Sequence, residues 1–345
     1  MERKKIKALA LFSGGLDSVL AIKLMEKQGI EVIALNFVSY FFGGKNEKAE
    51  KMANQLGVQL EYIDFKTRHL EVVKEPVYGR GKNMNPCIDC HSLMFKVAGE
   101  LLEKYEADFI ISGEVLGQRP MSQNSQALER VKELSGMGDY LVRPLSAKLL
   151  PISKPEELGW INRELLLDIE GRSRKYQMEL TEEYGIVDYP SPGGGCLLTD
   201  IDYSKKLSVF EEDEMLENEF NHLFNLTKIA RMFRFGEKKY VFVGRDNEGN
   251  HKVMEYQEKA DHIIRAFDTP GPVIGLFGDF QEEEIELACK FFSRYSKVKG
   301  KEVVSLLLDN QKKTISIIDV EEVEGLMREY QKIDKKRRNL IFNKR

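Results

Sequence analysis

The residues with the clearest chemical signal form a short glycine-rich turn, 13–18 (SGGLDS). Glycines let the backbone approach an anion, and a helix that starts there presents free N–H groups with partial positive charge. Asp17 does not suit pure anion binding, but a carboxylate at such a place can hold Mg²⁺ between phosphate oxygens. An ordinary helix cap explains only part of this set. The turn therefore predicts a nucleotide-phosphate site, and one that does not have the GxxxxGK[ST] pattern of a Walker-type loop.

Three cysteines form a second candidate site. Cys87 and Cys90 make a CxxC pair, and Cys196 follows three glycines in another turn-rich loop. One interpretation is a [4Fe-4S] cluster with three thiolate ligands and one open iron. A second is structural zinc with His91 as the fourth ligand, although adjacent Cys90 and His91 do not have the usual spacing. A third is redox catalysis, in which one cysteine carries a persulfide and another resolves it. Cys289 lies in an apolar helical pattern and is predicted to be a core cysteine.

Strand and helix patterns alternate around these motifs. Buried strands are predicted at 6–12, 31–39, 59–65 and 108–112, and helices at 19–25, 46–56, 91–105, 155–169 and 175–184. This alternation predicts an α/β fold, a doubly wound parallel sheet, whose ligands lie beyond the carboxyl ends of the strands.

The pattern changes after an acidic stretch near Glu211. Strands are predicted at 239–244, 273–277, 303–308 and 314–318, with one helix at 282–292. These elements indicate a second, smaller α+β domain. The predicted division is 1–185 for the nucleotide domain, 186–221 for the cysteine-bearing loop and linker, 222–330 for the second domain and 331–345 for a basic tail.

Composition narrows the class of protein. The chain has 345 residues, of which 42% are hydrophobic and 31% charged, so a largely disordered chain is excluded. A net charge of -4 does not indicate a nucleic-acid binder as a whole, although the basic tail could contact RNA or simply be solvated. The apolar runs are too short for a membrane span, and the N-terminus passes directly into a strand pattern. A cytoplasmic protein without membrane contact is expected.

The turn 13–18 resembles the fingerprint SGGxDS of the PP-loop ATP pyrophosphatases at every position. Members of that superfamily cleave ATP between the α and β phosphates and adenylate an acceptor carbonyl oxygen. The resemblance implies that ATP phosphates and Mg²⁺ are bound by Ser13, Gly14, Gly15, Asp17 and Ser18. Asn36, in the second predicted strand, is assigned to the same ATP site.

Residues 113–118 (GEVLGQ), with Ser122-Gln123 and Arg143-Pro144-Leu145, resemble segments of tRNA 4-thiouridine synthases. The resemblance implies that Gly113, Glu114 and Gln118 contribute to the nucleotide or base site. Cys196 resembles the catalytic cysteine of tRNA thiolation enzymes, including 2-thiouridylases, and Asp17, Cys87 and Cys90 join it as predicted catalytic residues. The chain departs from the bacterial 4-thiouridine synthases because neither a THUMP extension nor a rhodanese domain is apparent.

Residues 233–247 and the Pro270-Gly271 turn resemble the NFACT RNA-binding domain. The resemblance implies phosphate contacts by Arg231, Arg234, Lys238, Lys239 and Arg245. Phe233, Phe235 and Tyr240 would then be available for base stacking. The alternative is that these aromatic residues are core and the charges form a solvated face.

Together these resemblances predict an ATP-dependent tRNA sulfurtransferase that adenylates a uridine carbonyl and replaces its oxygen by sulfur, most simply as 4-thiouridine. The alternatives are 2-thiouridine synthesis and a PP-loop enzyme that thiolates or amidates a small molecule. The expected cofactors are ATP, Mg²⁺ and a [4Fe-4S] cluster. The expected partners are tRNA and a sulfur donor, either sulfide or a persulfide carrier, and a homodimer is one option for the assembly.

Overall fold

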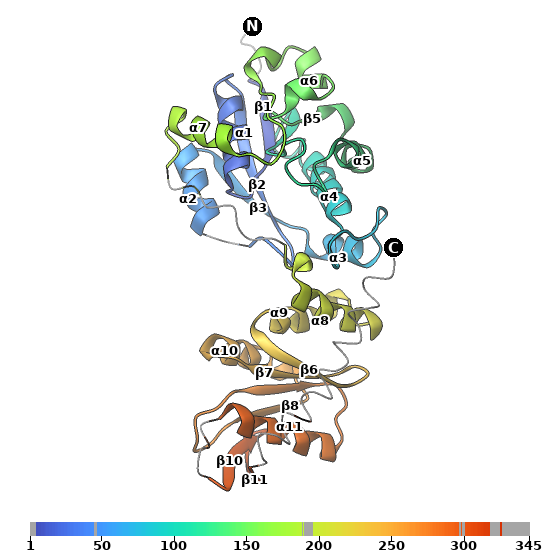
Figure 1. The fold of residues 1–345 in the computed structure, drawn as a ribbon, viewed down its shortest axis with the longest axis vertical. Helices are drawn as coiled ribbons and strands as arrows, with labels where there is room; N and C mark the ends of the chain where they lie inside the picture. The colour runs from blue at the N-terminus through green and yellow to red at the C-terminus, as the bar shows by residue number, and fades with distance from the viewer. Residues whose placement is uncertain are drawn as a thin grey trace. The chain divides into compact units, whose positions relative to one another are not determined.

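The computed structural model describes most of the chain, namely residues 5–44, 47–187, 189, 196–296, 298, 301–317 and 325. Contacts divide the chain into two compact units, Met1–Thr199 and Asp200–Arg345, each with its own sheet (Figure 1). The division falls inside the segment 186–221 that the sequence predicts as a linker. The loop 190–195 and the predicted basic tail 331–345 lie outside the described residues. No helix in the described part of the chain is both long and apolar enough to cross a lipid bilayer.

The first unit contains a five-stranded parallel sheet in the order β3-β2-β1-β4-β5. Its strands are β1 (Lys7–Leu11), β2 (Glu31–Val38), β3 (Gln59–Asp64), β4 (Phe109–Ser112) and β5 (Leu141–Val142). β1 lies at the centre, where Ala8 is in register with Val32 of β2 and Phe109 of β4. Because both faces of such a sheet are covered, the central strand is apolar from Ala8 onward instead of alternating. The predicted doubly wound α/β fold is confirmed.

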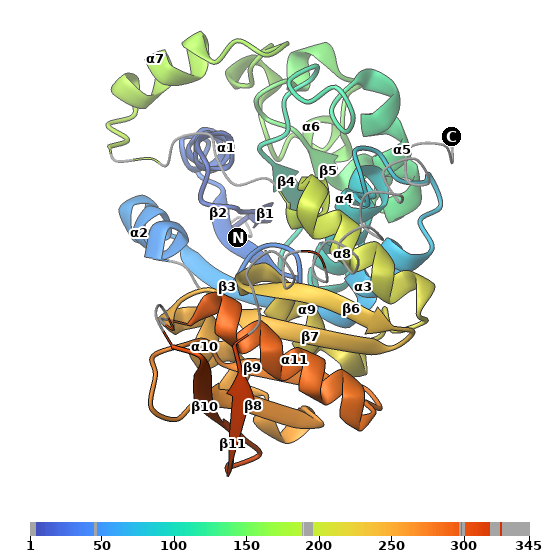
Figure 2. The same ribbon diagram turned by 60° about the horizontal axis from the view of Figure 1, so that its bottom comes forward.

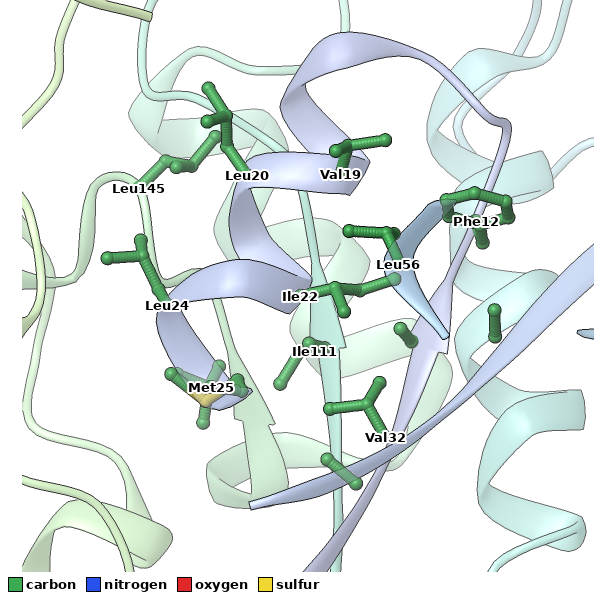
Figure 3. Close-up of a cluster of buried hydrophobic side chains, with 14 of the residues drawn as sticks. Phe12, Val19, Leu20, Ile22, Leu24, Met25, Val32, Leu56, Ile111 and Leu145 are labelled. Carbon is green, nitrogen blue, oxygen red and sulfur yellow. The ribbon is translucent and has the colours of Figure 1, made fainter. Parts of the chain in front are cut away.

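Helices cover both faces of this sheet (Figure 1). One face carries α1 (Leu16–Glu26), α2 (Glu47–Leu56) and α7 (Lys175–Glu183), and the other carries α3 (Lys66–Lys74), α4 (Cys87–Glu100) and α5 (Ser125–Ser135). Figure 3 shows the apolar cluster beneath α1, to which the helix contributes Val19, Leu20, Ile22, Leu24 and Met25. Since all five strands point the same way, the loops that follow them meet at one edge, here called the carboxyl edge.

One predicted helix of this unit is wrong. The segment 155–169 forms only the single turn α6 (Lys154–Glu157) and a separate 3₁₀ turn at Arg163–Leu165. A capping box between Ser153 and Glu156 starts α6, but Gly159 takes the left-handed conformation with φ +66° and ends it. The helix predicted from residue 91 begins four residues earlier, at Cys87.

The second unit begins with two helices, α8 (Ile201–Glu212) and α9 (Asn221–Ile229). An antiparallel sheet of six strands follows, in the order β11-β10-β8-β9-β7-β6. The strands are β6 (Ala230–Gly236), β7 (Lys239–Gly244), β8 (His262–Ala266), β9 (Ile274–Phe277), β10 (Val303–Leu308) and β11 (Gln311–Ser316). The predicted α+β character is confirmed. The sequence analysis missed β6 and β8, because arginines interrupt the apolar pattern of both strands.

Two layers of helix pack on this sheet. α11 (Glu282–Tyr295) covers one face with Ala288, Cys289, Phe291 and Phe292, all fully buried (Figure 2). α9 and α10 (Asn247–Glu255) contact β6, β7 and β9, where Val253 of α10 lies over Gly275 on the opposite face. The prediction that Cys289 is a core cysteine is confirmed.

Candidate functional site

The turn 13–18 lies at the carboxyl edge, between β1 and α1. Gly14 has φ +74°, and a Cβ there would lie 3.0 Å from the Cα of Ala49 in α2, so the position needs glycine. Gly15 is the N-cap of α1, and its N–H donates to the Ser13 hydroxyl at 3.3 Å. The Ser18 hydroxyl donates to the Gly15 carbonyl at 2.8 Å. The first N–H groups of an α-helix have no acceptor within the helix, so this turn can bind an anion.

Asp17 has one carboxylate oxygen in use and one free. Its Oδ2 accepts hydrogen bonds from Gln118 at 2.8 Å and from Arg174 at 3.1 Å. Its Oδ1 is buried and has no partner. A buried carboxylate oxygen with an unmet acceptor is costly, unless a donor or cation occupies the site during function. The arrangement therefore fits Mg²⁺ beside a bound phosphate.

Gly113 brings the end of β4 against the first turn of α1. A Cβ at this residue would lie 2.5 Å from the carbonyl carbon of Asp17 and 2.5 Å from the nitrogen of Ser18. Only glycine allows that approach, so Gly113 determines how closely the 113–118 loop packs on the phosphate turn. Its role in the structure is packing, and a nucleotide contact by Gly113 stays a prediction.

Glu114 is the centre of a buried network rather than a free ligand. Its Oε1 lies 2.7 Å from His91 Nδ1 of α4, and its Oε2 accepts from Arg143 Nε at 2.8 Å. Ser112 donates to the same Oε2 at 3.3 Å. Burial by itself raises the pKa of Glu114, but the charge of Arg143 and the contact with His91 outweigh it and lower that pKa to about 2. The network joins β4, α4 and the segment after β5.

Glu114→Gln is expected to destabilise the first unit by about 3–5 kcal/mol at neutral pH, because it leaves Arg143 buried without its counter-charge. The pKa of Glu114 is lowered from 4.5 to about 2 on folding, so the carboxylate stabilises the fold above about pH 4.5. That stabilisation, on the order of 3 kcal/mol, is lost as the pH falls toward 2. Urea unfolding followed by Trp160, the single tryptophan, reports on this unit.

The matched control for this change is Glu164→Gln. The Glu164 side chain is 84% exposed and lies 3.9 Å from Lys148, so its removal should leave the unfolding free energy within about 0.5 kcal/mol of the wild type. A Glu114→Gln protein with wild-type stability at pH 7 and a wild-type acid limb would contradict the role given to this network.

Arg174 and Gln177 are residues of this site that the sequence analysis missed. Arg174 forms an ion pair with Asp17, and Gln177 donates to the side chain of Gln118 at 3.2 Å. They reach the site because Gly171 N–H donates to the Leu116 carbonyl at 2.7 Å, which places the start of α7 beside the 113–118 loop. No local pattern marks either residue, because Gln177 is 59 residues from Gln118 in the sequence and Arg174 is 157 residues from Asp17.

Asn36 and Gln118 support the phosphate turn and its neighbours through side-chain hydrogen bonds. Asn36 of β2 is buried and donates to the Phe12 carbonyl at 3.0 Å, while its own carbonyl oxygen has no partner. Gln118 donates to Asp17 and accepts from Gln177, so it supports the carboxylate of the phosphate turn. The predicted ATP residues thus surround one turn, although their contact with ATP stays a prediction.

The three predicted site cysteines converge at the same edge. Cys87 and Cys90 lie in the first turn of α4, next to His91 of the Glu114 network. Cys196 lies beside the loop after β2, because the N–H of Leu197 donates to the Phe41 carbonyl at 3.2 Å. Asn83, in the loop before α4, donates to the Thr199 carbonyl at 2.8 Å and ties the two cysteine segments together.

The electrostatics of the thiols agree with this convergence. Burial raises the pKa of Cys196 to about 12, with a smaller contribution from Cys87. Burial, and then the proximity of Cys196 and Cys87, raise the pKa of Cys90 well above its usual value. Burial also raises the pKa of Cys87, although Asn85 donates to its sulfur at 2.8 Å. The free thiols are therefore protonated at neutral pH.

The sulfurs of Cys87, Cys90 and Cys196 are ligands that suit a soft metal, but the described side chains are not arranged as a complete metal site. Three cysteine sulfurs are the donor set that an iron–sulfur cluster with one open iron requires. Among the described residues, no group of three or more His, Cys, Asp or Glu side chains is placed to hold a metal ion. Asp89, between the two cysteines of α4, is used to accept from the backbone N–H groups of Val77 and Tyr78.

Two family models match the chain, one in each unit. Residues 4–148 match the model described as thiamine biosynthesis protein (ThiI), and residues 230–330 match the NFACT protein RNA binding domain. Over residues 4–148 the chain is therefore similar to the ThiI family. The match to ThiI includes the phosphate turn, the CxxC pair and Glu114, while Cys196 lies beyond its end. The NFACT match covers all six strands of the second sheet. Both family resemblances are thereby confirmed.

Individual relatives share low sequence identity with the chain and match only part of it. A protein named "Probable tRNA sulfurtransferase" from Thermococcus kodakarensis is 31% identical over 51% of this chain and 43% of its own length. A tRNA-specific 2-thiouridylase MnmA from Syntrophomonas wolfei is 27% identical over 52% of this chain and 53% of its own. The solved structure of a 4-thiouridine synthetase with RNA and ATP is 20% identical over 64% of this chain and 53% of that one, with a TM-score of 0.35. The chain spans about half the length of these curated relatives.

Several of the predicted RNA-binding cations in the NFACT-like domain already have partners. Arg234 forms an ion pair with the buried Asp213, and Lys239 pairs with Glu284 at 2.7 Å. The Arg231 guanidinium lies 4.5 Å over the ring of Tyr295. Lys238 and Arg245 are exposed. Their contact with RNA stays a prediction, and the exposed pair is the better placed for it.

The aromatic residues predicted for stacking in the NFACT-like domain belong to the core. Phe233 is 2% exposed and Tyr240 is fully buried. Phe235 packs edge-on against Phe291 of α11. Of the two interpretations that the sequence allowed for these aromatic residues, the structure supports the core.

Proposed function

We propose that the protein is an ATP-dependent tRNA sulfurtransferase that forms 4-thiouridine. The observation that carries this proposal is the meeting, at one edge of the first unit, of a phosphate turn and three cysteines. Glu114 links the two, because it follows β4 beside the phosphate turn and contacts His91 beside the CxxC pair. Activation of an acceptor and delivery of sulfur need these two features side by side.

The first half of the reaction uses the phosphate turn. ATP phosphates would bind the free N–H groups of α1 and the hydroxyls of Ser13 and Ser18. Mg²⁺ held near Asp17 would neutralise phosphate charge as it moves to the leaving pyrophosphate. Arg174, which shares Asp17 Oδ2, lies where it could bind the same phosphates. The carbonyl oxygen of the uridine would attack the α phosphorus and expel pyrophosphate.

The second half uses the cysteines. Sulfur attacks the adenylated carbon, the C–S bond forms, and AMP leaves with the former carbonyl oxygen. We propose that Cys87, Cys90 and Cys196 hold this sulfur, either through a [4Fe-4S] cluster or as a persulfide on Cys196. In the persulfide form, a persulfide carrier transfers its outer sulfur to Cys196, and that sulfur bonds to the adenylated carbon. Cys87 or Cys90 then attacks the Cys196 sulfur, the S–S bond breaks to release the thiolated base, and a thiol reductant reopens the resulting disulfide. When bound, the cluster would supply an open iron that holds sulfide as a nucleophile. The supporting observation is the convergence of three thiols, of which Cys90 is buried and Cys87 and Cys196 are partly buried. In their protonated form these thiols are poor nucleophiles by themselves.

The partners follow from this proposal. tRNA is the macromolecular substrate, sulfide or a persulfide carrier is the sulfur donor, and the NFACT-like domain holds the RNA. A uridine inside folded tRNA must be exposed before its carbonyl reaches the site, and a separate RNA-holding domain provides binding energy for that step. A homodimer and a cytoplasmic location belong to the same proposal.

The test is anaerobic incubation with unmodified tRNA, ATP and Mg²⁺, in parallel with sulfide or with a persulfide donor and a thiol reductant, followed by mass spectrometry of the nucleosides. 4-Thiouridine that requires both ATP and tRNA is the expected product. 2-Thiouridine would support the alternative that the similarity to the 2-thiouridylase suggests. Pyrophosphate release that is independent of RNA, without any thiolated nucleoside, would overturn the proposal in favour of a small-molecule acceptor.

A further inference from the structure

In the part of the chain that the structure describes, helices cover only part of one sheet face of the NFACT-like domain, and none of the roles above uses the rest of that face. α9 and α10 make their main contacts with β6, β7 and β9, so β8, β10 and β11 form the part of that face farthest from them (Figure 2). Phe267, directly after β8, is 51% exposed, and Val303 of β10 is 52% exposed. Single exposed apolar residues are common on protein surfaces, so the groups that lie beside Phe267 on the sheet decide whether this is a contact surface. We call this part of the sheet, as the described residues form it, the β8–β10–β11 face.

The registers show which residues share this face. Arg265, Leu307 and Lys312 lie in one row across β8, β10 and β11. Ser305 and Thr314 form the neighbouring row, with their hydroxyls 3.3 Å apart. The Lys312 ammonium lies 4.5 Å over the ring of Phe267, so the aromatic ring is on the same side.

The next residue of β11 identifies the opposite side. Lys313 lies 3.5 Å from Glu286 of α11, so it faces the helix that covers the other face of the sheet. Successive side chains of a strand point to opposite faces, and the two adjacent lysines therefore have different surroundings. This pair provides a matched comparison within one strand.

The charge of the face differs from that of the chain. The positions of β8, β10 and β11 that share it include Arg265 and Lys312 and no carboxylate, whereas the whole chain has a net charge of -4. Asp309, in the turn between β10 and β11, is bound to His262 and to the backbone of Ile263. An aromatic ring, two cations and two hydroxyls on a sheet are the groups that bind single-stranded RNA: bases stack on the ring and phosphates meet the cations.

We infer that the β8–β10–β11 face binds an unpaired segment of the tRNA substrate, with one base stacked on Phe267 and a phosphate beside Lys312. The inference rests on the proposed function, because it takes tRNA as the partner. It differs from the contacts predicted around β6 and β7, where Arg234 and Lys239 are held in ion pairs.

The test measures the affinity of the full chain for an unmodified tRNA transcript by fluorescence anisotropy at several salt concentrations. Phe267→Ala is expected to weaken binding about tenfold or more, and Phe267→Trp to retain it, because a larger ring preserves stacking. Lys312→Gln is expected to reduce the slope of log affinity against log salt by about one. Lys313→Gln is the control and should leave both quantities unchanged.

The outcomes separate this inference from the proposed function. Wild-type affinity and salt slope in both Phe267→Ala and Lys312→Gln, in a chain that still thiolates tRNA, would overturn the inference alone. A wild-type chain that does not bind tRNA would overturn the inference and the tRNA activity together. If Phe267→Ala instead converts a dimer to a monomer in light scattering and keeps its tRNA affinity, the face binds a second copy, and the inference is wrong.

Discussion

Asp17→Asn is expected to lower ATP-dependent pyrophosphate release by about 10²–10³-fold, the range measured when one group that stabilises transition-state charge is removed. Asparagine has the same shape, and its oxygen can still accept from Gln118 and Arg174. Its amide nitrogen would then occupy the place of Oδ1, the buried oxygen that has no partner within the protein. A cation ligand would become a donor, and Mg²⁺ could not bind there.

The control for this variant is Asp139→Asn. The Asp139 side chain is 68% exposed and pairs with Lys132 away from the turn, so pyrophosphate release should stay at the wild-type rate. Arg174→Gln tests the other explanation, that Asp17 acts only by holding Arg174. If Asp17 acts only by holding Arg174, Arg174→Gln and Asp17→Asn should lower pyrophosphate release to the same extent. Full activity of Asp17→Asn in a folded protein would contradict the metal role.

Cys196→Ala is expected to abolish thiolation of tRNA while pyrophosphate release continues. The phosphate turn and Asp17 are untouched by this change, so adenylation proceeds, but sulfur can no longer be held at the edge. Thiolated nucleoside by mass spectrometry and pyrophosphate by a coupled assay are measured in the same reactions. The large difference between these two readouts separates a sulfur-holding residue from one that merely stabilises the fold.

Cys289→Ala is the control for the loss of a thiol. Cys289 is fully buried under the NFACT-like sheet, so its removal should leave thiolation intact. Iron and sulfide content distinguish the two forms of the proposal. Loss of iron in each of the Cys87, Cys90 and Cys196 variants would support a cluster. Unchanged activity of the iron-free wild type, supplied with a persulfide donor and a thiol reductant, would support a persulfide. Retained thiolation in Cys196→Ala would contradict both.

The local elements of the site could be predicted because their signals are contiguous in the sequence. The turn 13–18 carries its own strand, glycines and helix start, and Gly14 has the positive φ that such a turn requires. The core position of Cys289 follows from a helical period. The helix at 155–169 could not be predicted correctly, because Gly159 ends α6 by a local conformation that an apolar period does not reveal.

The residues predicted to bind RNA show a different limit of the sequence. A run of arginines, lysines and aromatic residues around β6 and β7 predicts nucleic-acid contact by composition. In the fold, Phe233 and Tyr240 alternate into the two buried faces of the sheet, and Arg234 reaches Asp213 of the preceding segment. Phe267 and Lys312, which are 45 residues apart in the sequence, carry no joint signal before the strands place them together.

The sequence by itself determined the α/β pattern of the first unit, the phosphate turn and the CxxC pair, because each depends on neighbours within a few residues. Only the tertiary structure decided that Glu114 pairs with His91 and Arg143 and that Asp17 pairs with Arg174. Strand order determines which loops meet at the carboxyl edge, and each buried charge there pairs with a residue that a neighbouring segment places beside it. These pairs depend on the parallel order β3-β2-β1-β4-β5, which brings distant segments of the chain together.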